Sequence, residues 1–177
     1  MREPGTSHSP YGRVVTLMRR RAVASSVGLL LGIALLTGCS SPPPPPPKPV
    51  VTAVQLTLVA GVDVNPDVRG RASPLTVRVY ALKNVTDFEG ADFFSLFDKD
   101  QATLGAELVQ REEVLLRPGE SRTVNMTLPP DAKAIAVMAA YRDLDRARWR
   151  EVRALDVGKP LNATIRFGAR HIAIEPR

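Results

Sequence analysis

Residues 75–81 read LTVRVYA, and this run decides the fold class because its apolar side chains recur at every second position. A period of two is that of a β-strand with one buried face, since successive side chains point to opposite sides of a strand. The same alternation recurs in residues 54–58, 124–128, 161–167 and 172–174. We therefore predict a fold built mainly from short strands.

Three less regular apolar segments complete the set of predicted strands. They are residues 112–116, 149–155 and 135–141, of which the last is almost continuously apolar, as in a central strand. Turn-forming residues separate the strands at 117–120, 129–131, 158–160 and 168–169. About eight short strands at this spacing predict an all-β fold, an antiparallel β-sandwich.

One segment breaks the strand pattern. In residues 90–101, Phe93, Leu96 and Phe97 have the i, i+3, i+4 spacing of one helical face. Four of the five Phe residues lie between Phe88 and Phe97, and such a cluster on a short helix typically covers a core. We expect a small helical insertion packed against one end or face of the sandwich.

The N-terminal region has the features of an export signal. A basic cluster, Arg19 to Arg21, precedes the uncharged stretch Ala22–Ser41. The apolar centre of this stretch, Val27–Leu36, has the length of a signal-peptide core, roughly 7–15 residues, and is shorter than the ~20 residues of a transmembrane helix. Because Met18 directly precedes the basic cluster, we expect translation to begin there and residues 1–17 to be a mis-assigned start.

The export signal ends in Leu36-Thr37-Gly38-Cys39, which resembles a bacterial lipobox. The resemblance implies diacylglyceryl transfer to the Cys39 thiol, cleavage after Gly38 and acylation of the new amino terminus, with palmitate as a typical acyl group. Several acyl chains anchor a protein stably, whereas one chain alone is marginal. Ser40 follows the cysteine, and similarity to enterobacterial lipoproteins then implies lipid anchoring at the periplasmic face of the outer membrane. The alternative is an ordinary signal peptide with a chance cysteine.

The net charge belongs largely to the export signal. The 177 residues include 24 Lys+Arg and 18 Asp+Glu, a formal net charge of +6. Residues 1–38 hold five of the basic residues and one of the acidic ones, so the mature chain keeps 19 and 17, a net charge of +2. This balance gives no reason to expect a nucleic-acid partner.

We expect three parts in the chain: a signal peptide at 1–38, a lipidated cysteine with a polyproline tether at 39–49, and a β-sandwich domain at 50–177. Six consecutive prolines, Pro42 to Pro47, favour an extended polyproline II spacer of about 3.1 Å per residue. A PxxP ligand for a proline-binding module is the alternative.

Residues for catalysis or metal binding are scarce. The single Cys excludes an internal disulfide and a multi-Cys zinc site. His171 is the only histidine after the signal peptide, and we expect it to be an exposed strand residue. Asp63 to Asp67 imitates the start of an EF-hand loop, but Val68 and Pro74 replace the required Gly and Glu. We therefore predict no enzyme activity, no catalytic residue, no metal, no cofactor and no small-molecule substrate.

A second acidic pair and a long loop offer other roles. Asp143 and Asp145 are flanked by arginines, which favours a self-neutralised turn over a cation site. The loop of residues 61–73 is longer than the usual hairpin connection of 2–5 residues and carries isolated valines among turn-forming residues. We predict protein–protein contact there, or else a floppy surface loop. The candidate partner-binding residues are Val62, Asp63, Val64, Asn65, Pro66, Asp67 and Val68.

Several blocks, in this order, resemble the TssJ (SciN/VasD-like) family of type VI secretion outer-membrane lipoproteins. They are Ser73–Tyr80 with Leu82-Lys83, Ala91–Asp98, Leu104-Gly105, Leu116–Glu120, and Ala139–Asp143 followed by Trp149-Arg150. The blocks cover most of residues 51–174 and are specific only jointly. The lipobox is an independent point of agreement.

The resemblance implies a transthyretin-like β-sandwich of two four-stranded antiparallel sheets with a small helical insertion. It also implies a non-catalytic component of the membrane core complex, which anchors that complex to the outer membrane. The implied partner is the periplasmic C-terminal region of TssM, within a TssJ–TssL–TssM complex. In the family, the loop between the first two strands contributes to TssM contact, and that loop corresponds to residues 61–73 here.

Two other functions remain as alternatives. A ligand-binding transthyretin-like periplasmic lipoprotein would need a polar-lined pocket with a perturbed titratable group. An envelope-stress or adhesion module is disfavoured by the blocks above.

Overall fold

The computed structural model describes residues 49–176. The predicted signal peptide, the lipobox with Cys39 and the proline run at 42–47 lie outside the described residues. In the part of the chain that is described, no helix has the length and apolar character needed to cross a membrane.

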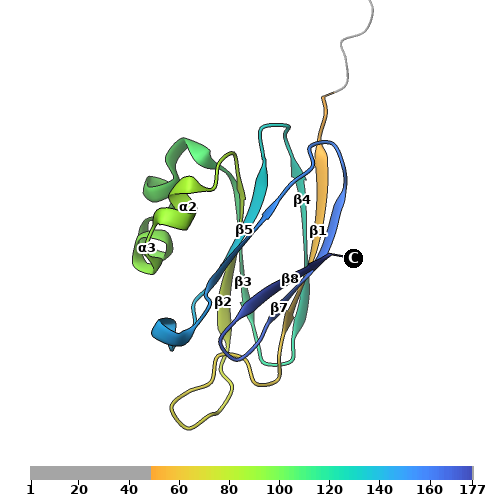
Figure 1. Ribbon diagram of the computed structural model, residues 1–177. Coiled ribbons are helices and arrows are strands. Elements are labelled where there is room, and N and C mark those ends of the chain that lie inside the picture. Colours follow the sequence, from red (N-terminus) through yellow and green to blue (C-terminus); the bar gives the residue numbers. More distant parts are fainter. Residues whose placement is uncertain (1–48, 177) are drawn as a thin grey trace, which may run out of the picture. The chain divides into compact units, whose positions relative to one another are not determined.

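Eight strands form two four-stranded sheets (Figure 1). The strands are β1 Thr52–Ala60, β2 Leu75–Leu82, β3 Leu108–Leu116, β4 Ser121–Leu128, β5 Ala134–Ala139, β6 Arg150–Ala154, β7 Leu161–Phe167 and β8 Ile172–Pro176. Sheet A has the order β4-β1-β7-β8, and sheet B has the order β3-β2-β5-β6. The predicted all-β sandwich of two four-stranded sheets is confirmed.

The prediction that both sheets are antiparallel is wrong for one pair of strands. β1 pairs with β7 in parallel, with Val54 beside Leu161 and Ala60 beside Phe167, whereas every other pair is antiparallel. Two strands run parallel only when the chain crosses over between them, and here the whole of sheet B intervenes in the sequence. Sheet A is therefore a mixed sheet.

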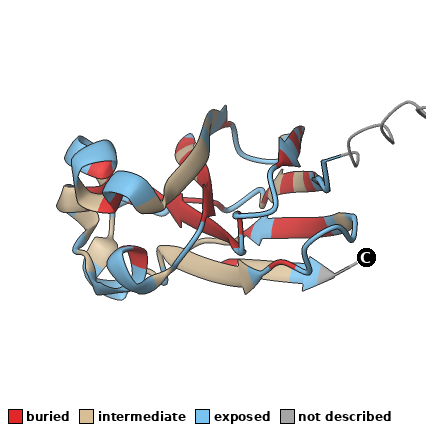
Figure 2. Ribbon diagram, turned by 90° about the horizontal axis from the view of Figure 1, so that it is seen from above, coloured by how far each residue is buried: buried red, intermediate tan, exposed pale blue. Residues whose placement is uncertain are grey.

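The main core lies between the sheets, as Figure 2 shows by the buried inner strands. On β1 the side chains of Val54, Leu56 and Leu58 are buried while Gln55 is exposed, which is the predicted alternation. All six residues of β5 are buried, as predicted for a central strand, because both faces of sheet B are covered at this strand.

Helices cover the outer face of sheet B (Figure 1). α2 spans Thr86–Gly90 and α3 spans Phe93–Leu104, followed by a short 3-10 helix, η2, at Gly105–Glu107. A second core cluster joins the two helices to the sheet through Phe88, Leu96, Leu104, Tyr80, Leu82, Ala136 and Met138. The predicted helical insertion against one face is confirmed, although it comprises two helices.

Two arginines of sheet B bind the backbone of these helices. Arg78 Nη1 donates to the carbonyls of Leu96 (3.3 Å) and Phe97 (2.6 Å). Arg150 Nη1 donates to the carbonyls of Phe88 (3.0 Å) and Ala91 (2.7 Å). Leu96 and Phe97 lie just before a kink at Lys99 in α3, and Phe88 and Ala91 lie in the last turn and at the C-cap of α2. The two guanidinium groups therefore bond to carbonyls where the helices are irregular or end, and they fix the insertion on the sheet.

Four connections meet at the end of the sandwich opposite to the start of β1, and we call this the distal end. They are the β1–β2 loop, the β3–β4 turn, the β5–β6 segment with the 3-10 helix η3 (Leu144–Arg146), and the β7–β8 turn. Backbone hydrogen bonds join them: Gly119 N donates to Gly61 O (3.2 Å), and Arg148 N donates to Arg170 O (2.8 Å). The chain therefore enters the domain at one end and presents a connected set of loops at the other.

Candidate partner-binding site

The β1–β2 loop is fixed to the core near its start. Val64 is fully buried in the main core, and its backbone carbonyl accepts a hydrogen bond from Ser73 N (3.1 Å). Burial of a valine side chain contributes about 1.5–3 kcal/mol. The valine and the hydrogen bond close the base of the loop, so the predicted floppy surface loop is not what the structure shows.

Asn65 connects this loop to the β5–β6 segment. Its side chain is 3% exposed, Nδ2 donates to Pro74 O (2.8 Å), and Oδ1 accepts from Arg142 N (2.8 Å). Asn65 has a φ of 50°, a left-handed conformation that asparagine adopts more readily than most residues. A single buried amide therefore holds two loops that are 77 residues apart in the sequence.

Asp67 orders the tip of the loop. Its carboxylate accepts hydrogen bonds from Arg69 N (2.8 Å), Arg71 N (3.0 Å) and Arg71 Nε (2.8 Å). The backbone and side-chain hydrogen bonds from Arg71 lower the pKa of Asp67. The predicted Asx-type turn is thus present, and it closes residues 66–71 into a small defined tip.

The β1–β2 loop presents two aliphatic side chains to solvent, one in the tip and one near the start of the loop. Val68 is 104% exposed and Val62 is 82% exposed, the two highest values among the large apolar residues of the described chain. Exposed valines on a pre-ordered loop are suited to protein–protein contact, because little conformational entropy remains to be lost on binding.

The seven predicted contact residues therefore fall into two groups. Val64 and Asn65 are buried and support the loop from beneath, so they offer no contact surface. The other five, Val62, Asp63, Pro66, Asp67 and Val68, are exposed or half-buried. The distinction could not be made from the sequence, because one valine in a polar loop has no periodic pattern around it.

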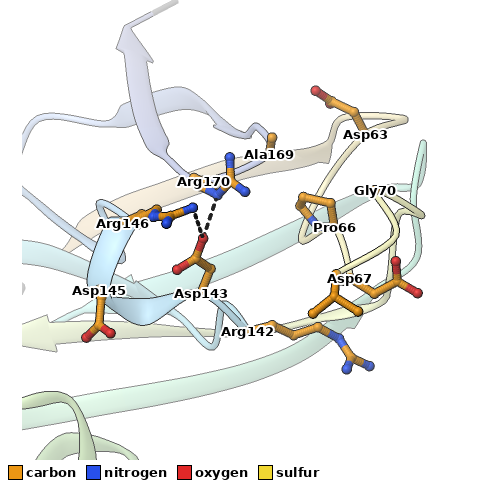
Figure 3. A pocket seen from close by; sticks show the side chains of 11 residues that line it. Asp63, Pro66, Asp67, Gly70, Arg142, Asp143, Asp145, Arg146, Ala169 and Arg170 are labelled. Atoms are coloured by element: carbon orange, nitrogen blue, oxygen red, sulfur yellow. Dashed lines mark hydrogen bonds and ion pairs between the residues drawn. The ribbon is translucent and has the colours of Figure 1, made fainter.

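A groove of about 1080 Å³ lies between this loop and the neighbouring connections (Figure 3). It is lined by Asp63, Pro66, Asp67, Val68 and Gly70 from the loop, by Arg142, Asp143, Asp145 and Arg146 from the β5–β6 segment, and by Ala169 and Arg170 from the β7–β8 turn. Asp143 pairs with Arg170 (2.9 Å) and more distantly with Arg146 (3.9 Å), as Figure 3 shows. The predicted self-neutralised turn is confirmed for Asp143.

The sequence analysis did not place Arg142, Arg146 or Arg170 beside the β1–β2 loop. Their proximity depends on which connections meet at the distal end, and that follows from the strand order rather than from any local pattern. The only signal in the sequence was that residues 139–143 belong to a block shared with the family resembled.

The strongest pKa perturbations are at two tyrosines, of which Tyr141 directly precedes the groove-lining Arg142 and also feels the charge of Asp63. Burial raises the pKa of Tyr80 to about 12, under the helical insertion. Burial also raises the pKa of Tyr141, whose hydroxyl donates to His171 O (2.8 Å). His171 itself is exposed, as predicted. Among the residues described, no group of three or more His, Cys, Asp or Glu is placed to hold a metal ion.

Comparisons with known proteins agree on one family. The T6SS-SciN family, described as "Type VI secretion lipoprotein, VasD, EvfM, TssJ, VC_A0113", matches residues 52–170. The T6SS lipoprotein TssJ1 from Pseudomonas aeruginosa is 43% identical, with a TM-score of 0.70, and the match covers 73% of this chain and 98% of that one. No curated protein sequence matches the chain.

Two further solved structures contain chains similar to this one. A chain in the structure "T6SS protein TssM C-terminal domain (869-1107) from EAEC" is 26% identical, with a TM-score of 0.61, over 71% of this chain and 98% of that chain. A chain in the structure "Type VI membrane complex" is 28% identical, with a TM-score of 0.62, over 70% of this chain and 98% of that one.

Proposed function

This chain belongs to the T6SS-SciN family of type VI secretion lipoproteins and is a component of the type VI membrane complex, and we propose that it anchors this complex to the outer membrane by binding the periplasmic C-terminal region of TssM. The proposed role is structural rather than catalytic. Two observations support it. The family and the similar TssJ1 are lipoproteins, and the distal end of the domain presents an ordered loop with an exposed apolar side chain.

The observation that carries the proposal is the pre-ordered tip of the β1–β2 loop. Val68 is fully exposed there, Asp67 closes the turn beneath it, and Asn65 ties the loop to the β5–β6 segment. An exposed aliphatic side chain on a pre-ordered loop can bury apolar surface against a partner at little cost in conformational entropy. The similar chain in a structure named for the TssM C-terminal domain supports TssM as the partner.

The membrane end of the proposal rests on Cys39 and on the position of β1. Lipidated Cys39 would join the domain through residues 40–49, which span roughly 30 Å when extended at about 3.1 Å per residue. The described chain enters at the end opposite to the distal loops (Figure 1). The domain could therefore be attached to a lipid anchor at one end while its distal loops bind a partner at the other.

A binding measurement tests the TssM contact. Val68→Asp should weaken binding of the purified periplasmic C-terminal region of the cognate TssM by about tenfold or more, because it would place an unpaired carboxylate in an apolar contact. Phe94→Asp is the matched control, because Phe94 is also exposed (63%) but lies on α3.

A loop deletion extends the same test. Replacing residues 66–71 by two glycines removes the tip and leaves Val64, Asn65 and Ser73, which fix the base of the loop. Circular dichroism should show an unchanged fold, and binding should be lost. Full binding by both variants would move the interface away from this loop.

A further inference from the structure

The four edge strands of the sandwich differ in how they are protected. An edge strand exposes unpaired backbone N–H and C=O groups, and natural proteins protect such edges by short length, charged side chains, proline or a covering segment. The edges here are β4 and β8 in sheet A, and β3 and β6 in sheet B. Each can be compared with these four means of protection.

Three edges are protected. β3 carries Arg111, Glu112 and Glu113 at its centre. β6 has only five residues, of which three are charged. β8 also has five residues, it ends in Glu175 and Pro176, and an isolated bridge between His171 and Arg148 connects its start to the segment before β6.

The β4 edge is the least protected of the four, because its only charged residue, Arg122, lies at the second position of the strand. β4 has eight residues, and its stretch from Thr123 to Leu128 contains no charged side chain and no proline. Within the described residues β4 pairs with β1 alone, so its other side remains unpaired. Such an uncharged edge is suited to adding another strand by main-chain hydrogen bonding.

The sequence of β4 is complementary to itself. If two copies are paired antiparallel with Asn125 opposite Asn125, then Thr123 lies opposite Thr127 and Val124 lies opposite Met126. Thr123, Asn125 and Thr127 are exposed on the outer face, while Val124 and Met126 point into the core. Between Thr123 and Thr127, polar side chains therefore meet polar ones and apolar side chains meet apolar ones, which is the pairing that stabilises a sheet.

Charges do not oppose this register. The only charged residue of β4, Arg122, falls opposite Leu128 of the second copy, so no like charges face each other. A two-fold axis through the Asn125 pair makes the interface isologous, the commonest arrangement of soluble dimers. We propose that two copies of this chain associate through their β4 edges to form one continuous eight-stranded sheet.

This pairing leaves the proposed TssM site free. The two-fold axis places the distal ends of the two copies at opposite extremes of the shared sheet, because the two β4 strands run in opposite directions. Each copy can then hold its own partner, and the β4 contact can fail without affecting TssM binding.

Disulfide trapping in cells tests the register. Cys39 is the only cysteine of the chain, so no other natural cysteine competes with one introduced into the full-length protein. After mild oxidation or treatment with a short bis-maleimide cross-linker, Asn125→Cys should run as a covalent homodimer on a non-reducing gel, since directly opposite Cβ atoms in an antiparallel pair lie about 4.5–5.5 Å apart, at the upper end of the range for a disulfide. The matched control is Asn162→Cys, which lies in the same row of the outer face but on the inner strand β7, and it should remain monomeric.

A mixed pair fixes the register further. Thr123→Cys and Thr127→Cys, co-expressed with different tags, should form a mixed disulfide that neither forms with itself. Adding Asn125→Lys should abolish this product by placing two ammonium groups together, whereas Asn162→Lys should leave it unchanged. TssM binding should be unaffected by Asn125→Lys.

Two results would overturn the proposal. One is the absence of an Asn125→Cys homodimer while the protein is folded and present at its normal level. The other is a disulfide adduct only with a different protein, which would show that the edge accepts another chain.

Discussion

Asn65 has an effect on the distal end that is large for one side chain. Its side-chain nitrogen donates to Pro74 O in the β1–β2 loop, and its side-chain oxygen accepts from Arg142 N in the β5–β6 segment. Loss of the amide would leave Pro74 O and Arg142 N without this partner. A buried polar group that loses its hydrogen bond costs about 1–3 kcal/mol.

We therefore expect Asn65→Ala to lower the free energy of unfolding by about 2–4 kcal/mol, because two hydrogen bonds and a favourable left-handed residue are lost together. Asn65→Gly separates these causes, since glycine tolerates the positive φ but makes no side-chain contact. Urea unfolding of both variants measures the difference. Asn162→Ala, at an exposed asparagine of β7, should change little, and an equally small effect of Asn65→Ala would contradict the bridging role.

Asp100 is the one buried acidic residue of the described chain, and it lies on the face of α3 that packs against sheet B. It accepts hydrogen bonds from Arg111 Nη1 (2.7 Å) and from the hydroxyl of Tyr80 (3.3 Å), and Arg78 Nη1 lies at 3.5 Å. Burial acts to raise the pKa of Asp100, but the hydrogen bond and charge of Arg111 outweigh burial, so the pKa is lowered from 3.8.

The lowered pKa has a defined consequence for stability against pH. The ionised form is favoured in the folded state, so its stabilisation is complete above the unfolded pKa and is lost as the pH falls through the folded pKa. Asp100→Asn should therefore be less stable than the natural protein by about 1.5–3 kcal/mol near neutral pH. This difference should shrink below a pH of about 3.8.

Urea unfolding near neutral pH and at about pH 3, below the ordinary pKa of Asp, measures the change. Asp98→Asn is the matched control, because Asp98 is exposed on the same helix. A difference between Asp100→Asn and the natural protein that stays constant over this pH range would show that the carboxylate charge does not matter.

At the scale of elements, α3 has a capped N-terminus, one face buried against sheet B and one face exposed to solvent. Asp92 is its N-cap and accepts from Ser95 N (3.0 Å), which satisfies an amide that has no helical partner. Leu96 is fully buried against sheet B, whereas Phe94 is 63% exposed although it is the larger side chain. Position on the helix therefore matters more than side-chain size.

Leu96→Ala should lower the free energy of unfolding by about 2–5 kcal/mol, because it leaves a cavity in the second core cluster. Phe94→Ala should cost about 1 kcal/mol or less, since mainly the edge contact with Phe93 is lost. Thermal unfolding followed by circular dichroism compares the two. Equal effects would mean that the insertion does not depend on the buried face of α3.

The elements were largely predictable because a half-buried strand imposes a period of two on its sequence. The strands at residues 75–81 and 161–167 were found in this way, and the helical spacing of Phe93, Leu96 and Phe97 indicated the insertion. The parallel neighbour of β1 could not be found, because alternation reveals which face of a strand is buried but not which strand lies beside it. The separation of α2 from α3 was also missed, since both carry Phe residues of one apolar cluster.

For the whole molecule, the loop between β1 and β2 was recognisable as a candidate site by its length. Its neighbours in the groove were not, because the β5–β6 segment and the β7–β8 turn reach the distal end only through the complete strand order. A surface assembled from distant connections has no local sequence pattern.

The anchoring proposal gives a prediction at this scale. Cys39→Ser removes the thiol that would receive the diacylglyceryl group, so the full-length protein should lose palmitate labelling and move from the membrane fraction to the soluble periplasm. The domain should remain folded, because the buried residues of its two core clusters all lie between Val54 and Ile172. Secretion should be lost, while normal secretion from the soluble variant would contradict the need for an anchor.

The position of β1 has a mechanical consequence. Held by a lipid at one end and by a partner at the distal end, the domain would experience tension directed along β1, since the chain enters at Thr52 and leaves for the loop at Ala60. β1 is hydrogen-bonded on both sides, to β4 and to β7, along most of its length. A pull along this axis loads both ladders in shear, so their hydrogen bonds must break together rather than one after another. If the proposed anchor carries load, β1 is thus the strand best placed to resist being pulled out of the domain.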